Sequence, residues 1–140
     1  MPLNGFDSIC KERQGIIVSK DSGNRVKHIA NNVNLNRVTH YRIDGFVITE
    51  GNRCDYLLIN EDSKVAYLIE LKGSDLQKAA IQLESTEKTL QRELHQYELK
   101  YRIVASRAKT HAIESVTFRR FKARKGLALV YSTNQIEETI

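Results

Sequence analysis

The chain has 140 residues, of which 41% are hydrophobic and 28% are charged, and its formal net charge is +5. This length and mixture are typical of one globular domain with its own core, and the positive charge favours a polyanionic partner. No apolar run approaches the ~20 residues that span a bilayer, and residues 1–15 lack a signal-peptide core, so we expect a cytoplasmic protein with no membrane partner.

The first 40 residues give weak signals for secondary structure. Residues 1–14 predict a short first helix with apolar and charged sides, and residues 15–19 predict a strand. Residues 24–40 are rich in asparagine and basic side chains and have poor periodicity, which predicts a loop with short ordered pieces. This loop could contact phosphates or be an ordinary connection, and both interpretations stay open.

A two-stranded hairpin is predicted over residues 54–72, CDYLLINEDSKVAYLIELK. β-Branched, aromatic and leucine residues fill two arms, 55–59 and 65–72, and turn-forming residues lie between them. The preceding residues 41–49 predict a further strand with a bend at Asp44-Gly45. Asp44 is therefore more natural in a turn than as a metal ligand.

Charged residues gather at one end of this hairpin. Side chains alternate along a strand, so Glu70 and Lys72 project from the same face. In an antiparallel hairpin, Asp55 at the start of the first arm lies beside the end of the second. Buried charges are costly unless they are paired or bound to a metal. Lys72 could simply neutralise Glu70 at a frayed strand end, but the position of Asp55 favours a cation site.

The second half of the chain predicts a helix followed by two strands. Ser74 and Gln77 form a capping-box pattern, and apolar residues at helical spacing extend the helix to about residue 100. Residues 101–106 predict a strand parallel to the hairpin, residues 127–132 a last strand, and residues 134–140 a helical tail.

The segment 102–125 is strongly basic, and its two phenylalanines, Phe118 and Phe121, are expected to pack in the core. Contacts from arginine and lysine to phosphates carry most of the sequence-independent affinity for nucleic acid. The alternative is a solvated basic helix face. The cations expected to bind nucleic acid are Arg102, Arg107, Lys109, Arg119, Arg120, Lys122, Arg124 and Lys125.

Asp55, followed after fourteen residues by Glu70-Leu71-Lys72, resembles the core of the PD-(D/E)XK nuclease superfamily, which includes restriction endonucleases and archaeal-type Holliday junction resolvases. The likeness covers residues 44–105 and departs from the pattern at Cys54, where the superfamily motif has proline. It implies an α/β, restriction-endonuclease-like fold for residues 1–140. In this single domain a mixed β-sheet would be flanked by helices, with the site at the sheet edge where the hairpin arms splay.

The resemblance also implies a function, a metal-dependent DNA endonuclease that could be selective for a structure such as the Holliday junction. Asp55, Glu70 and the backbone carbonyl of Leu71 would bind Mg²⁺, for which Mn²⁺ substitutes. Lys72 would orient the attacking water or help to deprotonate it.

Two further site residues and a homodimer follow from the same resemblance. Gln82 on the long helix would reach the active site, and a solvent-facing glutamine is the simple alternative. Glu12 on the first helix is the nearest candidate for a further acid at the metal site, but a solvated surface glutamate is the favoured interpretation. A chain of this size would need a second copy or a partner to cut both strands of a duplex, so a homodimer is expected.

Other chemistries have little support in the sequence. The cysteines and histidines lack zinc-ligand spacing, and no glycine-rich phosphate loop is present, so no nucleotide cofactor is expected. Two other classes remain open. One is a module that binds nucleic acid without cutting it, and the other is a protein-interaction subunit that uses the long helix.

Overall fold

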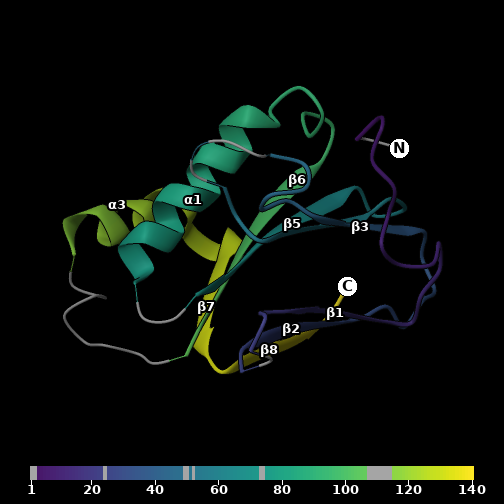
Figure 1. Ribbon diagram of the computed structural model, residues 1–140, viewed down its shortest axis with the longest axis horizontal. Coiled ribbons are helices and arrows are strands. Elements are labelled where there is room, and N and C mark those ends of the chain that lie inside the picture. Colours follow the sequence, from purple (N-terminus) through teal and green to yellow (C-terminus); the bar gives the residue numbers. More distant parts are fainter. Residues whose placement is uncertain (1–2, 24, 49–50, 52, 73–74, 107–114) are drawn as a thin grey trace.

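The structure, a computed structural model, describes residues 3–23, 25–48, 51, 53–72, 75–106 and 115–140, and of Lys72 the backbone alone. These residues form an α/β arrangement of two mixed sheets and two α-helices (Figure 1). The elements are β1 (Ile16–Lys20), β2 (Lys27–Asn31), β3 (Val38–Arg42), β4 (Tyr56–Asn60), β5 (Val65–Lys72), α1 (Leu76–Thr89), β6 (Glu98–Ala105), α3 (Val116–Lys125), the 3-10 turn η1 (Gly126–Ala128), β7 (Leu129–Thr133) and β8 (Gln135–Thr139).

The larger sheet has five strands in the order β3-β4-β5-β6-β7. Strands β3, β4 and β5 are antiparallel, whereas β6 and β7 continue parallel to β5. The predicted hairpin is confirmed, with Tyr56 opposite Ile69. The side chain of Asn60 accepts hydrogen bonds from the N–H groups of Asp62 and Ser63, which holds the turn. Helix α1 provides the crossover that parallel pairing of β5 and β6 requires.

Both α-helices cover one face of this sheet (Figure 1). Leu57 of β4 and Leu68 of β5 point to this face and pack with Leu83 of α1 and with Phe118 and Phe121 of α3. The prediction that the two phenylalanines are core residues is confirmed, since both are completely buried. Neither described helix, at 14 and 10 residues, is long enough to cross a bilayer.

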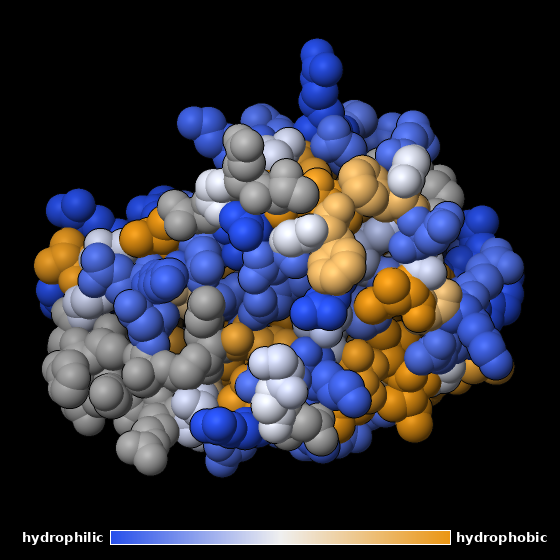
Figure 2. Space-filling view, viewed as in Figure 1, coloured by the Kyte–Doolittle hydropathy of each residue, from blue (hydrophilic) through white to orange (hydrophobic). Residues whose placement is uncertain are grey.

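The opposite face is covered by a sheet of order β1-β2-β8 and not by helices, which corrects the expectation of a sheet flanked by helices. Ile17 of β1, Ala30 of β2 and Ile136 of β8 pack against Leu58 and Ile69 of the larger sheet. Figure 2 shows hydrophobic side chains gathered where the two sheets meet, and mainly hydrophilic ones over the helices.

The described part of 24–40 contains β2 and the start of β3 with a loop between them, which fits the predicted loop with short ordered pieces. Two other predictions about local structure are wrong. The tail, expected to be helical, forms β8, which pairs in parallel with β2. Residues 3–15 form turns that run along β3, where the Ile9 N–H donates to the His40 carbonyl at 2.8 Å. In each case, backbone pairing with a distant segment outweighs the weak local preference.

The helix is also shorter than predicted. The side chain of Asp75 caps α1 by accepting a hydrogen bond from the Lys78 N–H, and the proposed cap Ser74 lies outside the described residues. Helix α1 ends at Thr89 because the chain must return to the start of β6, where the Glu98 N–H donates to the Lys64 carbonyl at 2.8 Å. Fourteen helical residues span about 21 Å, close to the length of an eight-residue strand.

A buried ionic network joins the two sheets. Arg102 of β6, only 4% exposed, donates from Nε and Nη2 to the carboxylate of Glu138 of β8 at 2.7 and 3.0 Å. His28 Nε2 of β2 lies 2.6 Å from the same carboxylate. Burial alone would raise the pKa of Glu138, but the hydrogen bonds from His28 and Arg102 lower this pKa to about 2. Glu138 is therefore ionised at neutral pH.

His40 is expected to make stability depend on pH. It is 3% exposed, lies 2.8 Å from Ser19 Oγ through Nε2 and stacks on Tyr56. Burial, and then the nearby His28, lower the pKa of His40 from 6.5 to about 4. The unfolded chain therefore takes up a proton at this position before the folded protein does. The free energy of unfolding should fall by about 2 kcal/mol between pH 7 and pH 5.

Urea unfolding of wild type and His40→Gln at pH 7 and pH 5 tests this expectation. The variant should lose most of the pH dependence, whereas His95→Gln, at an exposed position, should keep it. An unchanged dependence in His40→Gln would assign the effect to another group.

Candidate active site

The candidate site lies where β5 continues beyond the end of β4. The last residue pair of the β4–β5 ladder is Tyr56 with Ile69, and Glu70, Leu71 and Lys72 pair with β6 alone. Asp55 occupies the position beside this extension. Its N–H donates to the Ile69 carbonyl at 3.1 Å, and its Oδ2 accepts a hydrogen bond from the Leu71 N–H at 2.8 Å. Because β5 is the middle strand, the site is at a strand end and not at the lateral edge of the sheet.

Glu70 is completely buried on the face of the sheet that carries the helices. Its side chain alternates with those of Ile69 and Leu71, which enter the core between the sheets. The thiol of Cys54 lies near both acids. Burial raises the pKa of Cys54, and the carboxylates of Glu70 and Asp55 raise it further. Because the Asp55 carboxylate binds the N–H of Leu71, the residue after Glu70, the two acids lie on neighbouring positions at the end of β5, next to an apolar core.

Helix α1 contacts this region through a hydrogen bond to Thr86. The Cys54 N–H donates to Thr86 Oγ1 at 2.7 Å, and Thr86 Oγ1 donates to the Gln82 carbonyl at 2.9 Å. Gln82 lies one turn before Thr86, so both side chains share the buried face of α1. Gln82 Oε1 is buried and accepts no hydrogen bond from the described residues. A buried acceptor of this kind is suited to a water or ligand at the site.

Leu71 and Lys72 occupy the end of β5. The Leu71 side chain enters the core between the sheets, so only its backbone is directed to the site. The N–H and C=O of one strand residue project to the same side. The Leu71 carbonyl therefore points to the side where its N–H meets Asp55. Lys72 lies opposite Ala105 of β6, and its side chain falls outside the described part of the structure.

The donor atoms fit Mg²⁺ better than zinc. Two carboxylates, a backbone carbonyl and an amide oxygen are hard oxygen donors, and Mg²⁺ commonly uses one or two carboxylates with waters and substrate phosphates. The described residues contain no group of three or more histidine, cysteine, aspartate or glutamate side chains that could hold a metal ion.

Glu12 does not lie at this site and is exposed, which fits the favoured interpretation of a surface glutamate and rejects it as a metal ligand. Its carbonyl accepts a hydrogen bond from the Val38 N–H at 2.7 Å, and Val38 pairs with Asn60 next to the hairpin turn. Asp55 is five residues away along β4, roughly 17 Å at 3.4 Å per residue. The metal-ligand alternative fails because the helix expected to carry Glu12 does not form. Asp44 lies in a turn and pairs with Arg53 at 2.7 Å.

The basic segment is only partly available to a partner. Arg102 is buried in its pair with Glu138, which corrects its expected contact with phosphates. Arg124 pairs with Glu84 at 2.5 Å and Lys125 with Glu87 at 3.0 Å. Arg107 and Lys109 lie outside the described residues. The exposed cations of α3 without an ion pair to a described residue are Arg119, Arg120 and Lys122.

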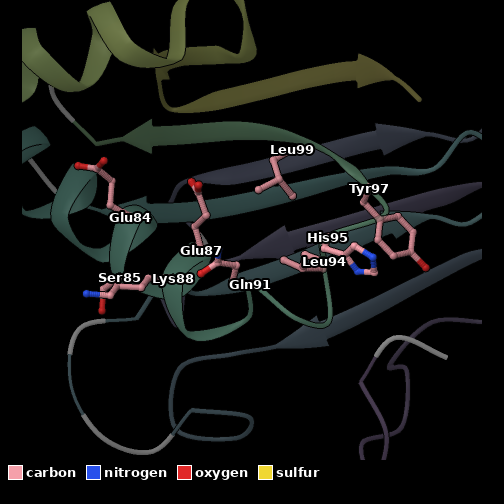
Figure 3. Close-up of a pocket in the computed structure, with 9 residues that line it drawn as sticks. All are labelled: Glu84, Ser85, Glu87, Lys88, Gln91, Leu94, His95, Tyr97 and Leu99. Carbon is pink, nitrogen blue, oxygen red and sulfur yellow. The ribbon is translucent and has the colours of Figure 1, made fainter.

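A groove of about 790 Å³ beside the second half of α1 is a different feature (Figure 3). Its acidic residues Glu84 and Glu87 face Arg124 and Lys125. Leu99, also in its lining, pairs with Ala66 near the hairpin turn, at the opposite end of β5 from Glu70. No motif in the sequence predicts this groove, and it contains no group that the candidate chemistry needs.

Comparisons with protein-family models, with curated proteins and with solved structures found no match. Function therefore has to be inferred from the residues and their geometry.

The sequence does not predict the contribution of Thr86, because a helical threonine whose hydroxyl accepts a hydrogen bond from a distant N–H has no sequence signature.

Cys54 is expected to resist alkylation while the protein is folded. The thiolate is the reactive species, and burial raises the pKa of this fully buried thiol. Cys10 is partly exposed, and although burial raises its pKa, the hydrogen bond with Ser8 opposes the increase. Iodoacetamide at pH 8, followed by peptide mass spectrometry, should modify Cys10 first and Cys54 only after unfolding. Equal rates would contradict the described burial.

Proposed function

We propose that this chain is a metal-dependent endonuclease with a restriction-endonuclease-like fold, related to the PD-(D/E)XK superfamily. One observation carries the proposal. Asp55 accepts a hydrogen bond from the Leu71 N–H beside a completely buried Glu70, at the end of strands that are otherwise apolar. Carboxylates beside apolar strands are the kind of ligand that a divalent cation binds and whose charge it offsets.

The arrangement around the carboxylates also supports the proposal. An antiparallel hairpin leads into α1, and α1 leads into a parallel strand, which is the order of elements predicted from the sequence pattern. The contact of Cys54 with Thr86 holds α1 against the start of β4. A catalytic site built on strands and a helix keeps its geometry better than one built on loops.

Each residue has a distinct task in this proposal. Asp55, Glu70 and the Leu71 carbonyl would hold Mg²⁺ or Mn²⁺, which would neutralise charge on the scissile phosphate and make a water more acidic. The hydrogen bond from the Leu71 N–H fixes the orientation of the Asp55 carboxylate. Gln82 Oε1 would accept a hydrogen bond from the attacking water, and the Lys72 amine would orient that water or take up its proton.

Nucleic acid would be held by its backbone. Arg119, Arg120 and Lys122 on α3 are exposed and would contact phosphates. Such contacts release counterions, so affinity should decrease as the salt concentration rises. One chain carries one candidate site, and we therefore propose that two copies act together when both strands of a duplex are cut.

A cleavage assay tests the proposal. Plasmid, linear duplex, single-stranded DNA, a four-way junction and RNA would be incubated with the protein in Mg²⁺, Mn²⁺ or EDTA. At least one substrate should be cut with either metal and none in EDTA. Salt-dependent binding without cleavage would instead identify a non-catalytic nucleic-acid-binding module. Absence of both would reject a role on nucleic acid.

A further inference from the structure

The turn between β1 and β2 lies at the same end of the molecule as the candidate site, on the other face of the large sheet (Figure 1). Two chains of contacts place it there. Tyr56, next to Asp55, donates from its hydroxyl to the Lys20 carbonyl at 3.0 Å. The Lys27 N–H donates to the Asn134 carbonyl at 3.1 Å, and the Asn134 N–H donates to the Ala105 carbonyl at 2.8 Å.

These contacts fix the turn relative to the carboxylates. Ala105 is the residue opposite Lys72 in the β5–β6 ladder, and Tyr56 is opposite Ile69, one residue before Glu70. The turn is itself held from within, because Val26 is buried in the core between the sheets. The described residues of this segment, 20–23 and 25–27, therefore border the site.

Three cations on this border have no ionic partner among the described residues. Lys20 and Arg25 are exposed and Lys27 is half-buried. Asp21, the acid in the turn, is engaged through Oδ1, which accepts hydrogen bonds from the N–H groups of Arg25 and Val26 at 2.8 and 3.2 Å. This differs from the predicted basic segment, where three of the described cations pair with glutamates.

We propose that Lys20, Arg25 and Lys27 form a second phosphate-binding surface for double-stranded nucleic acid. Arg119, Arg120 and Lys122 lie on the helical side of the sheet, and the β1–β2 turn lies on the opposite side, with the strand ends that carry Asp55 and Glu70 between them. A duplex placed across these ends would have cations on both sides of the scissile phosphate. This inference rests on the proposed function: the second surface would position the nucleic acid that the proposed nuclease cuts.

The test compares two triple variants with equal loss of charge. Lys20→Ala/Arg25→Ala/Lys27→Ala removes the proposed surface, and Lys11→Ala/Lys88→Ala/Arg92→Ala removes three exposed cations that likewise have no ion pair to a described residue and lie toward the hairpin-turn end. Binding of a labelled duplex would be followed by fluorescence anisotropy in EDTA at several KCl concentrations. The first variant should bind at least about tenfold more weakly at 0.1 M salt, with a salt slope smaller by roughly 2 to 3, because each phosphate contact contributes about 0.9.

The outcomes separate this inference from the proposed function. The charge-preserving variant Lys20→Arg/Arg25→Lys/Lys27→Arg should bind like wild type, and thermal unfolding would show that all variants are folded. If wild type binds and cuts the duplex while the two alanine variants bind alike, the second surface is rejected and the nuclease proposal stands. If wild type shows no salt-dependent binding and no cleavage, the proposed function is rejected as well.

Discussion

Glu70→Gln is expected to reduce phosphodiester cleavage by about 10³-fold while nucleic acid binding changes by less than about threefold. The substitution removes one negative charge from a completely buried position and keeps the side-chain volume. Metal-assisted stabilisation of a transition state is worth several kcal/mol, and each 1.36 kcal/mol corresponds to a factor of ten in rate. An alanine would also open a cavity and so mix catalysis with stability.

A matched control and a second readout make this result specific. Glu98→Gln makes the same chemical change at a glutamate whose side chain is 70% exposed, on the opposite end of the sheet, and should cut like wild type. Binding of Mn²⁺ by calorimetry should weaken in Glu70→Gln and not in Glu98→Gln. Cleavage by Glu70→Gln at the wild-type rate would remove the candidate site from consideration.

Arg102→Leu is expected to lower the free energy of unfolding by about 3–5 kcal/mol. The guanidinium is buried, and its removal leaves the Glu138 carboxylate without two of its hydrogen bonds and with His28 as its remaining partner in the network. Two hydrogen bonds of 2.9 Å to the carbonyls of Tyr101 and Ala128 are lost as well. Urea unfolding at pH 7 measures the change.

Two comparisons show whether the ionic pair is responsible. Arg119→Leu, at an exposed cation of α3, should change the stability by less than about 0.5 kcal/mol. Arg102→Leu/Glu138→Leu should recover part of the loss, because it removes the buried cation and its partly buried partner together. A loss below 1 kcal/mol in Arg102→Leu would mean that water or another group replaces the guanidinium.

The same network is expected to weaken in acid. The hydrogen bonds from His28 and Arg102 outweigh burial and depress the pKa of Glu138 from 4.5 to about 2. A carboxylate with a depressed pKa contributes stability that is fully present above pH 4.5 and is lost as the pH falls toward 2. The difference in stability between wild type and Glu138→Gln should therefore shrink over this range. A constant difference would contradict ionisation of Glu138 in the native protein.

The sequence predicts those parts of the fold that depend on local pattern. Strands β4 and β5 have continuous apolar arms around a polar turn, and α1 has apolar residues at helical spacing, so both were predictable. The second sheet was not predictable, because β2 pairs with β8, which follows much later in the sequence. Lys27, for example, lies opposite Gln135. Neither strand has enough local periodicity to show that it needs a distant partner.

The predicted site residues likewise divide into those that depend on local pattern and those that depend on distant segments of the chain. The meeting of Asp55 with the end of β5 follows from strand alternation and hairpin geometry, which the residues specify locally. Glu12 required a helix that a few apolar positions suggested and that backbone pairing with β3 replaces. Arg102 could not be distinguished from surface cations, because its partner Glu138 is 36 residues further along the chain.

The parallel pairing of β2 with β8 also has a kinetic consequence. Pairing between segments so far apart is slow to form, because a long stretch of chain must be ordered before the contact is gained. Until β8 adds to β2, the hydrogen bond from Lys27 to Asn134 cannot hold the β1–β2 turn beside the carboxylates. A nascent chain would therefore bring Asp55 beside the end of β5 before this contact of the β1–β2 turn is made.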